Sequence, residues 1–432
     1  MKMNKQTALI VVAMVLGILV GYACNVLSGG PAAAKEIAGY FAMVTDIFLR
    51  LIKMIIAPLI FSTLVAGMAG MGDARAVGRI GGKAVGWFLM ASVASLTIGL
   101  IFANLFQPGA DVGVPLPEAG AAVSLKTSAL NLREFVTHVF PRNFFEAMAN
   151  NEILQILVFS VFVGLALGKL RETKARTLVQ SIEEVVPVML TVTDYVMRFA
   201  PIGVFAAVAN VVATQGLGVL LVYGKFMGSF YVALVVLWAF LIGAGFLVLR
   251  TDVFRLVRTV REPMLLGFST ASSESAYPRV MEQLKGFGIK ERVIGFVLPL
   301  GYSFNLDGSM IYTTFASLFI AQAYNLPLGL EQQLLMLLVL MVSSKGIAGV
   351  PRSSLVVVAA VLPMFNLPEA GVLLIMGIDH FLDMGRTATN VLGNAIATAV
   401  VGKWENAIGA EEEVGEEEMA EEDALPAAAV AD

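Results

Sequence analysis

The chain has 432 residues, of which 58% are hydrophobic and only 14% are charged. Soluble globular domains carry about 25% charged residues, so this composition excludes an ordinary soluble protein. Several apolar runs reach the ~20 residues that a helix needs to cross a bilayer, and no strand pattern that could close a barrel is present. The sequence therefore predicts an all-α polytopic membrane protein.

The net charge of −4 hides an uneven distribution along the chain. Eleven acidic residues and no basic residue follow Lys403, so residues 1–403 carry a net charge of +7. The composition of 404–432 is typical of a disordered, solvated acidic tail. The single cysteine, Cys24, excludes an internal disulfide.

Six apolar runs predict six spanning helices in the first 250 residues. The first has a basic start, which would also fit a cleaved signal peptide, but it is long enough to span and favours an uncleaved helix. Between the third and fourth runs, the polar stretch 107–150 is proline-rich and predicts an exposed connection. The runs are 7–27, 43–70, 84–106, 152–169, 184–213 and 218–248.

The distribution of Lys and Arg predicts the orientation of these helices. If the N-terminus is cytoplasmic, the inner segments hold thirteen basic residues and the outer segments hold four. Cytoplasmic loops carry an excess of basic residues. We therefore expect both termini in the cytoplasm and the connection 107–150 outside.

The last third of the chain contains two interrupted apolar segments. Basic residues flank both ends of the apolar part 263–284, which favours a hairpin over 254–285 that enters from the cytoplasm and returns, with its tip at 272-SSES-275. A second interrupted segment, 330–364, has no base near its outer ends and predicts a hairpin entering from outside. Each is followed by one spanning helix, 293–324 or 369–403. This inverted repeat is typical of secondary transporters, and the total becomes eight spanning helices plus two hairpins.

The final helix carries a stripe of polar residues. A spacing of three or four residues places such groups on one face of a helix. A charge at the centre of a bilayer costs at least ~2.5 kcal/mol, so this face must meet protein, water or a ligand. A polar network that seals helices together is the alternative. The stripe consists of Asp379, Asp383, Arg386, Thr387, Asn390 and Asn394.

The interrupted segments supply groups that complement this stripe. Helices broken inside a membrane leave N–H and C=O groups that are tolerated around a cavity, and free N–H groups suit a carboxylate. Ser272 and Ser273 add hydroxyl donors at the inner tip, and Gly349 allows close approach of the backbone at the outer tip. Ordinary surface loops are the alternative reading of both tips. A second break, at 305-NLDGS-309, adds Asn305, Asp307 and Ser309.

The stripe and the tips together predict the class of ligand. Arg386 and the tip amides offer two ways to hold a carboxylate, and Asp383 offers one way to hold an ammonium group. A molecule with two carboxylates and one amine satisfies all three. The residues therefore point to an acidic amino acid.

Four separated motifs carry a resemblance to a known family. The strings SSES, NLDGS, GIAGVP and DMGRTATN, with 50-RLIKMIIAPLIFSTLVAGMAGMGDA-74, resemble those of the dicarboxylate/amino acid:cation symporters, the glutamate transporter family. The likeness covers nearly the whole chain and is greatest to bacterial proton-coupled glutamate/aspartate symporters. It implies the glutamate-transporter fold, a homotrimer in the bacterial inner membrane and alternating access. It implies no enzymatic activity, no cofactor and no nucleic-acid partner.

The resemblance also divides the chain into functional parts. A transport unit would move against a static scaffold, and the hairpins would belong to the moving unit. The expected parts are scaffold helices 1–2 (1–70), transport helix 3 (84–106), the extracellular connection (107–150), scaffold helices 4–5 (152–213), a transport domain (218–403) with the inner hairpin at 254–285 and the outer hairpin at 330–364, and the acidic disordered tail (404–432).

The family pattern implies a role for each matching position. Asp383 would bind the substrate amine, and Arg386 would bind its side-chain carboxylate. Thr387 and Asn390 would add hydrogen bonds. The main-chain carboxylate would be held by Ser273, Ser309 and the backbone at Gly349 and Val350, beside Ser272.

Departures from the family pattern bear on the coupling ion. Sodium-coupled members have an Asp where this chain has Asn394, a Tyr and a Thr where it has Phe88 and Ala91, and a carbonyl-lined site where it has Lys345. Asp307 and Ser92 remain. We therefore expect coupling to protons, with sodium as the alternative. Glu274 is the foremost proton carrier, unless it is a solvated tip residue, and the other ion-coupling candidates are Asp307, Asp379, Asn305, Asn394 and Lys345.

Several alternatives stay open at this point. A C4-dicarboxylate carrier of the same family would not need an acid at Asp383. An intramembrane hydrolase could use Ser344 and Lys345, although neighbouring residues on a helix do not face each other. An ion channel is the third. Arg352 could touch substrate or outer water, and His380 diverges by about 100° from Asp379 on a helix.

Overall fold

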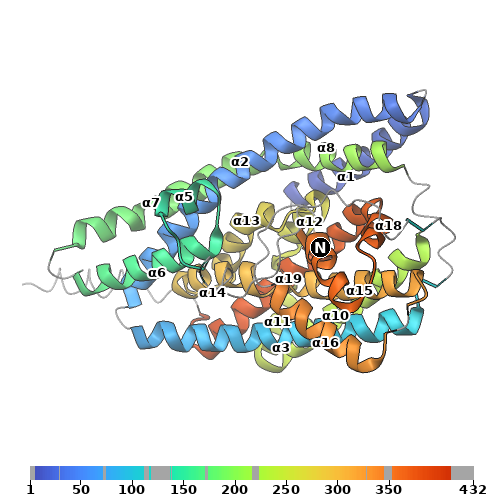
Figure 1. Cartoon of the computed structure of the whole chain (residues 1–432). Helices are drawn as coiled ribbons and strands as arrows, with labels where there is room; N and C mark the ends of the chain where they lie inside the picture. The colour runs from blue at the N-terminus through green and yellow to red at the C-terminus, as the bar shows by residue number, and fades with distance from the viewer. Residues whose placement is uncertain are drawn as a thin grey trace, which may run out of the picture.

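The computed structural model describes residues 5–28, 30–71, 74–110, 116–117, 137, 139–170, 174–216, 223–326, 328–344 and 353–409. The named secondary-structure elements within these residues are helices (Figure 1), which confirms the predicted all-α fold. The first part contains α1 (Lys5–Leu27), α2 (Pro31–Met71), α3 (Ala74–Phe106), α5 (Phe144–Ala149), α6 (Ile153–Leu170), α7 (Arg176–Met197), α8 (Ala200–Gln215) and α10 (Gly224–Leu249). The second part contains α11 (Asp252–Thr259), α12 (Arg261–Thr270), α13 (Ser273–Gly286), α14 (Glu291–Phe304), α15 (Asp307–Ala323), α16 (Leu330–Ser343), α17 (Ser353–Val361), α18 (Val372–Met376) and α19 (Asp379–Trp404). Two short 3-10 helices lie at Leu362–Phe365 and Glu369–Gly371.

Five of these helices are long and apolar enough to cross a membrane. They are α1, α2, α3, α6 and α10. The predicted fifth span, 184–213, is not one straight helix, because α7 and α8 meet at an angle of 51°. Pro201 in the first turn of α8 has no N–H to donate to the carbonyl of Met197, and a proline ring inside a straight helix would clash with the carbonyl four residues earlier. The bend follows from this missing bond.

Glycines bring α1 and α8 into close contact. A Cβ atom on Gly17 would lie 2.8 Å from the carbonyl oxygen of Phe205, and one on Gly21 would lie 2.7 Å from that of Ala209. The two glycines are four residues apart, the spacing that lets helices approach closely in membranes. With α2, these helices form one edge of the molecule in Figure 1.

The two segments predicted as hairpins contain short helices. The α12 and α13 helices pack against each other and are joined by Ala271, in the left-handed conformation with φ of +50°, and Ser272. The Ser272 side chain caps α13 by accepting a hydrogen bond from the Ser275 N–H. The α16 and α17 helices also pack together. The predicted outer tip, with Gly349, lies outside the described residues.

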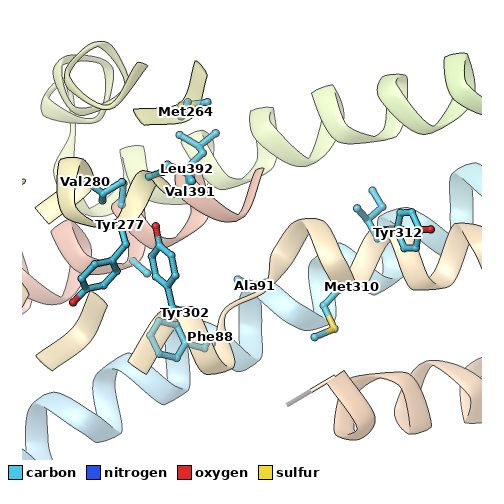
Figure 2. Close-up of a cluster of buried hydrophobic side chains, with 14 of the residues drawn as sticks. Phe88, Ala91, Met264, Tyr277, Val280, Tyr302, Met310, Tyr312, Val391 and Leu392 are labelled. Carbon is cyan, nitrogen blue, oxygen red and sulfur yellow. The ribbon is translucent and has the colours of Figure 1, made fainter. Parts of the chain in front are cut away.

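The polar helix α19 lies inside the protein. It packs against α3, α10, α12, α13, α14 and α15, and every residue from Leu382 to Gly402 is buried. Figure 1 shows α19 in the middle of the molecule. Figure 2 shows Val391 and Leu392 of this helix near Tyr277 and Tyr302 in the apolar core. Protein, and not lipid, therefore covers α19.

Candidate functional site

The centre of the site is an ion pair within one turn of α19. Arg386 and Asp383 are in contact through their charged groups, and their side chains are only 9% and 6% exposed. Arg386 Nη1 also donates a hydrogen bond to Ser354 Oγ on α17. The two charges that the sequence placed on one face are thus together, buried, and in contact with the second hairpin segment.

Tyr312 on α15 links Asp379, another acidic position of α19, to this pair. Its hydroxyl donates a hydrogen bond to Asp379 Oδ1 at 2.5 Å. Its ring centroid lies 5.9 Å from the guanidinium carbon of Arg386, a distance at which a cation interacts with an aromatic face. Asp379 therefore lies on the same side of α19 as Arg386, as the stripe predicted.

The broken helix α14–α15 is fixed to α19 through Asn390. Asn390 Oδ1 accepts a hydrogen bond of 2.8 Å from the Gly308 N–H, and Asn390 Nδ2 donates one of 3.3 Å to Ser309 Oγ. A Cβ atom on Gly308 would lie 2.1 Å from the carbonyl oxygen of Arg386. The first turn of α15 thus presses directly on the backbone that carries the ion pair.

A second group of polar residues lies further along α19. Asn305 Nδ2 donates a hydrogen bond of 3.3 Å to Asn394 Oδ1. A Cβ atom on Gly301 would lie 2.3 Å from the same Asn394 oxygen and 3.5 Å from the Phe88 ring. The amide pair is therefore bounded by an aromatic ring on the α3 side. Asp307 is fully buried nearby, against Gly393.

The α12–α13 segment reaches the same face of α19. A Cβ atom on Gly267, one turn before the tip, would lie 3.1 Å from Thr387 Cγ2. Among the described residues, the buried Thr387 Oγ1 has no hydrogen-bond partner. Ser273 begins α13 and is half-buried. The hydroxyl of Thr387 is available to a ligand in this region.

Glu274 is buried and is not a solvated tip residue. Its side chain is 8% exposed and lies in the first turn of α13. Its Oε2 is 3.4 Å from Lys53 Nζ on α2. An acid in the first turn also interacts favourably with the helix dipole.

The remaining predicted positions fall into two groups. Gly349, Val350, Lys345 and Arg352 lie outside the described residues. Ser92 is buried on α3, and His380 is half-buried on α19.

Sequence reasoning missed three residues that contact the site. Tyr312 lies in an apolar run with nothing to distinguish it, and Lys53 lies in the second apolar run, more than 200 residues from Glu274. Ser354 closes the string 343-SSKGIAGVPRSS-354, but it was not singled out. Its hydroxyl beside the outer tip was the one available signal.

The far end of α19 is tied to α3 by charge. Glu405 accepts hydrogen bonds from Arg79 at 2.8 Å and from Lys83 at 2.6 Å. These bonds lower the pKa of Glu405 to about 2, and the bond from Arg79 has the largest effect. Trp87 and Trp404 pack edge to face beside them, with ring centroids 6.0 Å apart.

The chain combines apolar helices long enough to span a membrane, helices that break beside a buried ion pair, and a polar stripe enclosed by protein. These features are those of a membrane transport protein. Residues 7–404 match the family described as "Sodium:dicarboxylate symporter family". The chain belongs to this family, which confirms the resemblance that the four motifs carried.

Relatives of known name are similar over almost the whole chain. A proton/sodium-glutamate symport protein of Bacillus caldotenax is 37% identical over 95% of this chain and 97% of the relative. A proton/glutamate-aspartate symporter of Escherichia coli is 39% identical over 92% of each. A C4-dicarboxylate transport protein of Citrifermentans bemidjiense is 42% identical over 84% of each.

These findings establish the general activity. The chain is a multi-pass membrane symporter of the dicarboxylate and glutamate type, which takes a substrate and a coupling ion, and it is not an enzyme. The intramembrane hydrolase is thereby excluded.

Proposed function

We propose that this symporter imports acidic amino acids, L-glutamate or L-aspartate, together with protons. The observation that carries the proposal is the buried contact between Asp383 and Arg386 on α19. Burying two charges is costly unless each is paired. A ligand that offers both a cation and an anion can replace this contact without leaving either charge alone.

An acidic amino acid performs that replacement completely. Its ammonium group pairs with Asp383, and its side-chain carboxylate pairs with Arg386, which can hold a carboxylate through two parallel hydrogen bonds. Its remaining carboxylate needs donors elsewhere. Thr387 Oγ1, the hydroxyls of Ser273 and Ser309, and the backbone near Gly349 and Val350 are the donors that we assign to it, with Ser272 and Asn390 holding the hairpin and α15 in position.

The surroundings of the amide pair support protons as the coupling ion. Sodium is a hard cation and binds oxygen ligands, as other hard cations do. Near Asn394, the α3 side offers the Phe88 ring, and Ala91 is fully buried one turn further on. Neither supplies an oxygen from its side chain. The carboxylates that we propose as proton carriers are Glu274 first, then Asp307 and Asp379.

The transport cycle that fits this site is alternating access. Helices α3 and α10–α19 would form the moving transport unit, and α1, α2 and α6–α8 would form the scaffold. We propose a homotrimer in the bacterial inner membrane, with both termini in the cytoplasm and eight spanning helices plus two hairpins. Because substrate and proton would occupy one enclosed region, each would stabilise the same closed form for the other.

A C4-dicarboxylate carrier is the second candidate. The relative from Citrifermentans bemidjiense bears that name and is 42% identical. A dicarboxylate without an amine would leave Asp383 with no cation once Arg386 turned to the substrate. That cost favours the amino acids.

Uptake into proteoliposomes tests the substrate and the ion together. Labelled aspartate, glutamate and succinate would each be offered with an inward proton gradient, an inward sodium gradient or neither. We expect aspartate or glutamate to accumulate when the proton gradient alone is imposed. Accumulation that requires sodium and ignores pH would overturn proton coupling, and accumulation of succinate alone would overturn the amino-acid assignment.

A further inference from the structure

The contact between Lys53 and Glu274 joins two parts of the chain that the proposed cycle moves apart. Lys53 lies on α2, in the proposed scaffold, and Glu274 begins the second helix of the inner hairpin. The two helices pack against each other. The ammonium and carboxylate groups are 3.4 Å apart, with the lysine 37% and the glutamate 8% exposed.

The surroundings of Glu274 leave Lys53 as the group that stabilises the negative charge of its carboxylate. In the part of the chain that the structure describes, Lys53 is the cation within ion-pair distance of the carboxylate. The other titratable groups near it are Glu152, just before α6, and the hydroxyl of Tyr302 on α14. A second carboxylate and a buried phenol do not compensate a negative charge. Without Lys53, burial would favour the protonated acid.

A second ion pair crosses between α13 and the proposed scaffold with the opposite polarity. Arg279 Nη1 lies 3.5 Å from Asp194 Oδ1 on α7. Arg279 is also paired within the hairpin, with Glu262 of α12 at 3.1 Å and with Glu282. It therefore keeps partners if it leaves Asp194, whereas no second cation accompanies Glu274 among the described residues.

We propose that Lys53 is a positioning residue for proton coupling, because its contact with Glu274 ties the ionised state of this carboxylate to the docked position of the inner hairpin. When the hairpin lies against α2, the ammonium group keeps Glu274 ionised. When the hairpin moves away, the buried carboxylate loses its cation and takes one proton from water. Return of the hairpin releases that proton to water, so that only an O–H bond forms and breaks. The inference rests on the proposed proton coupling.

The test is the pH dependence of aspartate uptake by Lys53→Met. Removing the ammonium group lets Glu274 hold its proton at higher pH, so we expect the upper pH limit of uptake to rise by about one unit or more. Lys53→Arg keeps the charge and should keep the wild-type profile. Arg50→Met removes a base one turn earlier on the same helix and is the matched control. Glu274→Gln should abolish the pH dependence, with or without Lys53→Met.

Two results would overturn the inference. One is a Lys53→Met profile that superimposes on the wild-type profile or moves to lower pH. The other is an equal shift in Arg50→Met. A fall in the uptake rate with an unchanged profile would assign Lys53 a structural role only, and that also overturns the proposal.

A second measurement does not depend on the coupling ion. In a Cys24→Ser background, Lys53→Cys and Glu274→Cys would be bridged by Hg²⁺ in membranes. We expect bridging that decreases when aspartate is added, and bridging that is unchanged by aspartate would contradict a contact that breaks during the cycle. If uptake by the unmodified chain follows sodium and ignores pH, the proposed coupling ion fails, while bridging still reports whether the hairpin docks on α2.

Discussion

The helices α10 and α19 have the same length and opposite characters. Each has 26 residues, or about 39 Å at 1.5 Å per residue. The α10 helix is apolar and partly uncovered, with Leu247 74% exposed. The α19 helix carries two acids, an arginine and two asparagines on one face, and protein covers it from Leu382 to Gly402.

The difference shows how a membrane protein accommodates a charged helix. The apolar helix packs against the polar one and leaves its own other side uncovered by protein. Tyr231 of α10 donates a hydrogen bond of 2.6 Å to the carbonyl of Phe381, and Trp238 donates one of 2.8 Å to Thr389. These bonds hold α10 against α19. The polar face can then be used for binding, because none of it meets hydrocarbon.

Among substitutions on the two helices, loss of Arg386 on α19 should reduce uptake most. Arg386→Ala leaves Asp383 buried without its paired cation, and breaking a buried ion pair costs ~3–5 kcal/mol. We expect uptake of aspartate, glutamate and succinate at low concentration to fall by about 100-fold or more. Leu247→Ala on α10 is the control and should stay within about twofold. Uptake by Arg386→Ala within tenfold of wild type would remove this residue from the site.

Asp383→Ala separates the binding of the substrate amine from the binding of the substrate carboxylates. The variant removes the partner of the substrate amine, and a hydrogen bond to a charged group contributes ~1.5–3 kcal/mol. We expect aspartate uptake to fall about 10- to 100-fold while succinate uptake is spared. Competition between labelled aspartate and unlabelled succinate measures the ratio directly. An equal loss for both substrates, or no effect, would refute the assignment of the amine.

Matched glycine substitutions compare the packing of the two helices. A Cβ atom on Gly393 of α19 would lie 2.1 Å from Asp307 Oδ2, whereas one on Gly243 of α10 meets nothing within 4 Å. Gly393→Ala should destabilise the protein by ~1–3 kcal/mol through overpacking. Gly243→Ala should be neutral or stabilise it by up to ~1 kcal/mol, because alanine favours a helix. Thermal unfolding in detergent distinguishes them, and equal melting temperatures would contradict the close packing of α19.

The smallest effect concerns the end of α19 at Glu405. The pKa of this acid is lowered to about 2 by Arg79 and Lys83, so its stabilising contribution is complete above its ordinary pKa of 4.5 and is lost as the pH falls towards 2. Glu405→Gln should lower the melting temperature by less than about 2 °C at pH 7. The gap to wild type should close as the pH falls below 4.5. A gap that is unchanged at pH 3 would mean that charge does not hold this end.

Local patterns in the sequence predicted much of the site. The three- and four-residue spacing in α19 placed Asp383, Arg386 and Asn390 on one face, and the structure buries all three. The string NLDGS marked the break before α15, where Ser309 meets Asn390. These features depend on helix periodicity and on residues that interrupt a helix, both of which are readable within a few turns.

Contacts between distant segments could not be predicted in this way. The spacing of residues in α2 does not indicate that Lys53 meets Glu274, and nothing near Tyr312 distinguishes it from its apolar neighbours. The bend between α7 and α8 was missed for another reason. Both halves of 184–213 are apolar, so hydropathy merged them, although Pro201 marked the point where the helix could not continue.

The interlocking of α15 with α19 limits which motions the protein can use. Gly308 leaves no room for a methyl group against the backbone at Arg386, and Gly393 leaves none against Asp307. Sliding one helix along the other would bring larger side chains to these two points of close approach, where they would clash. We therefore expect the pair to move as a rigid body in the proposed transport cycle, so that labels attached to α15 and α19 keep a constant separation.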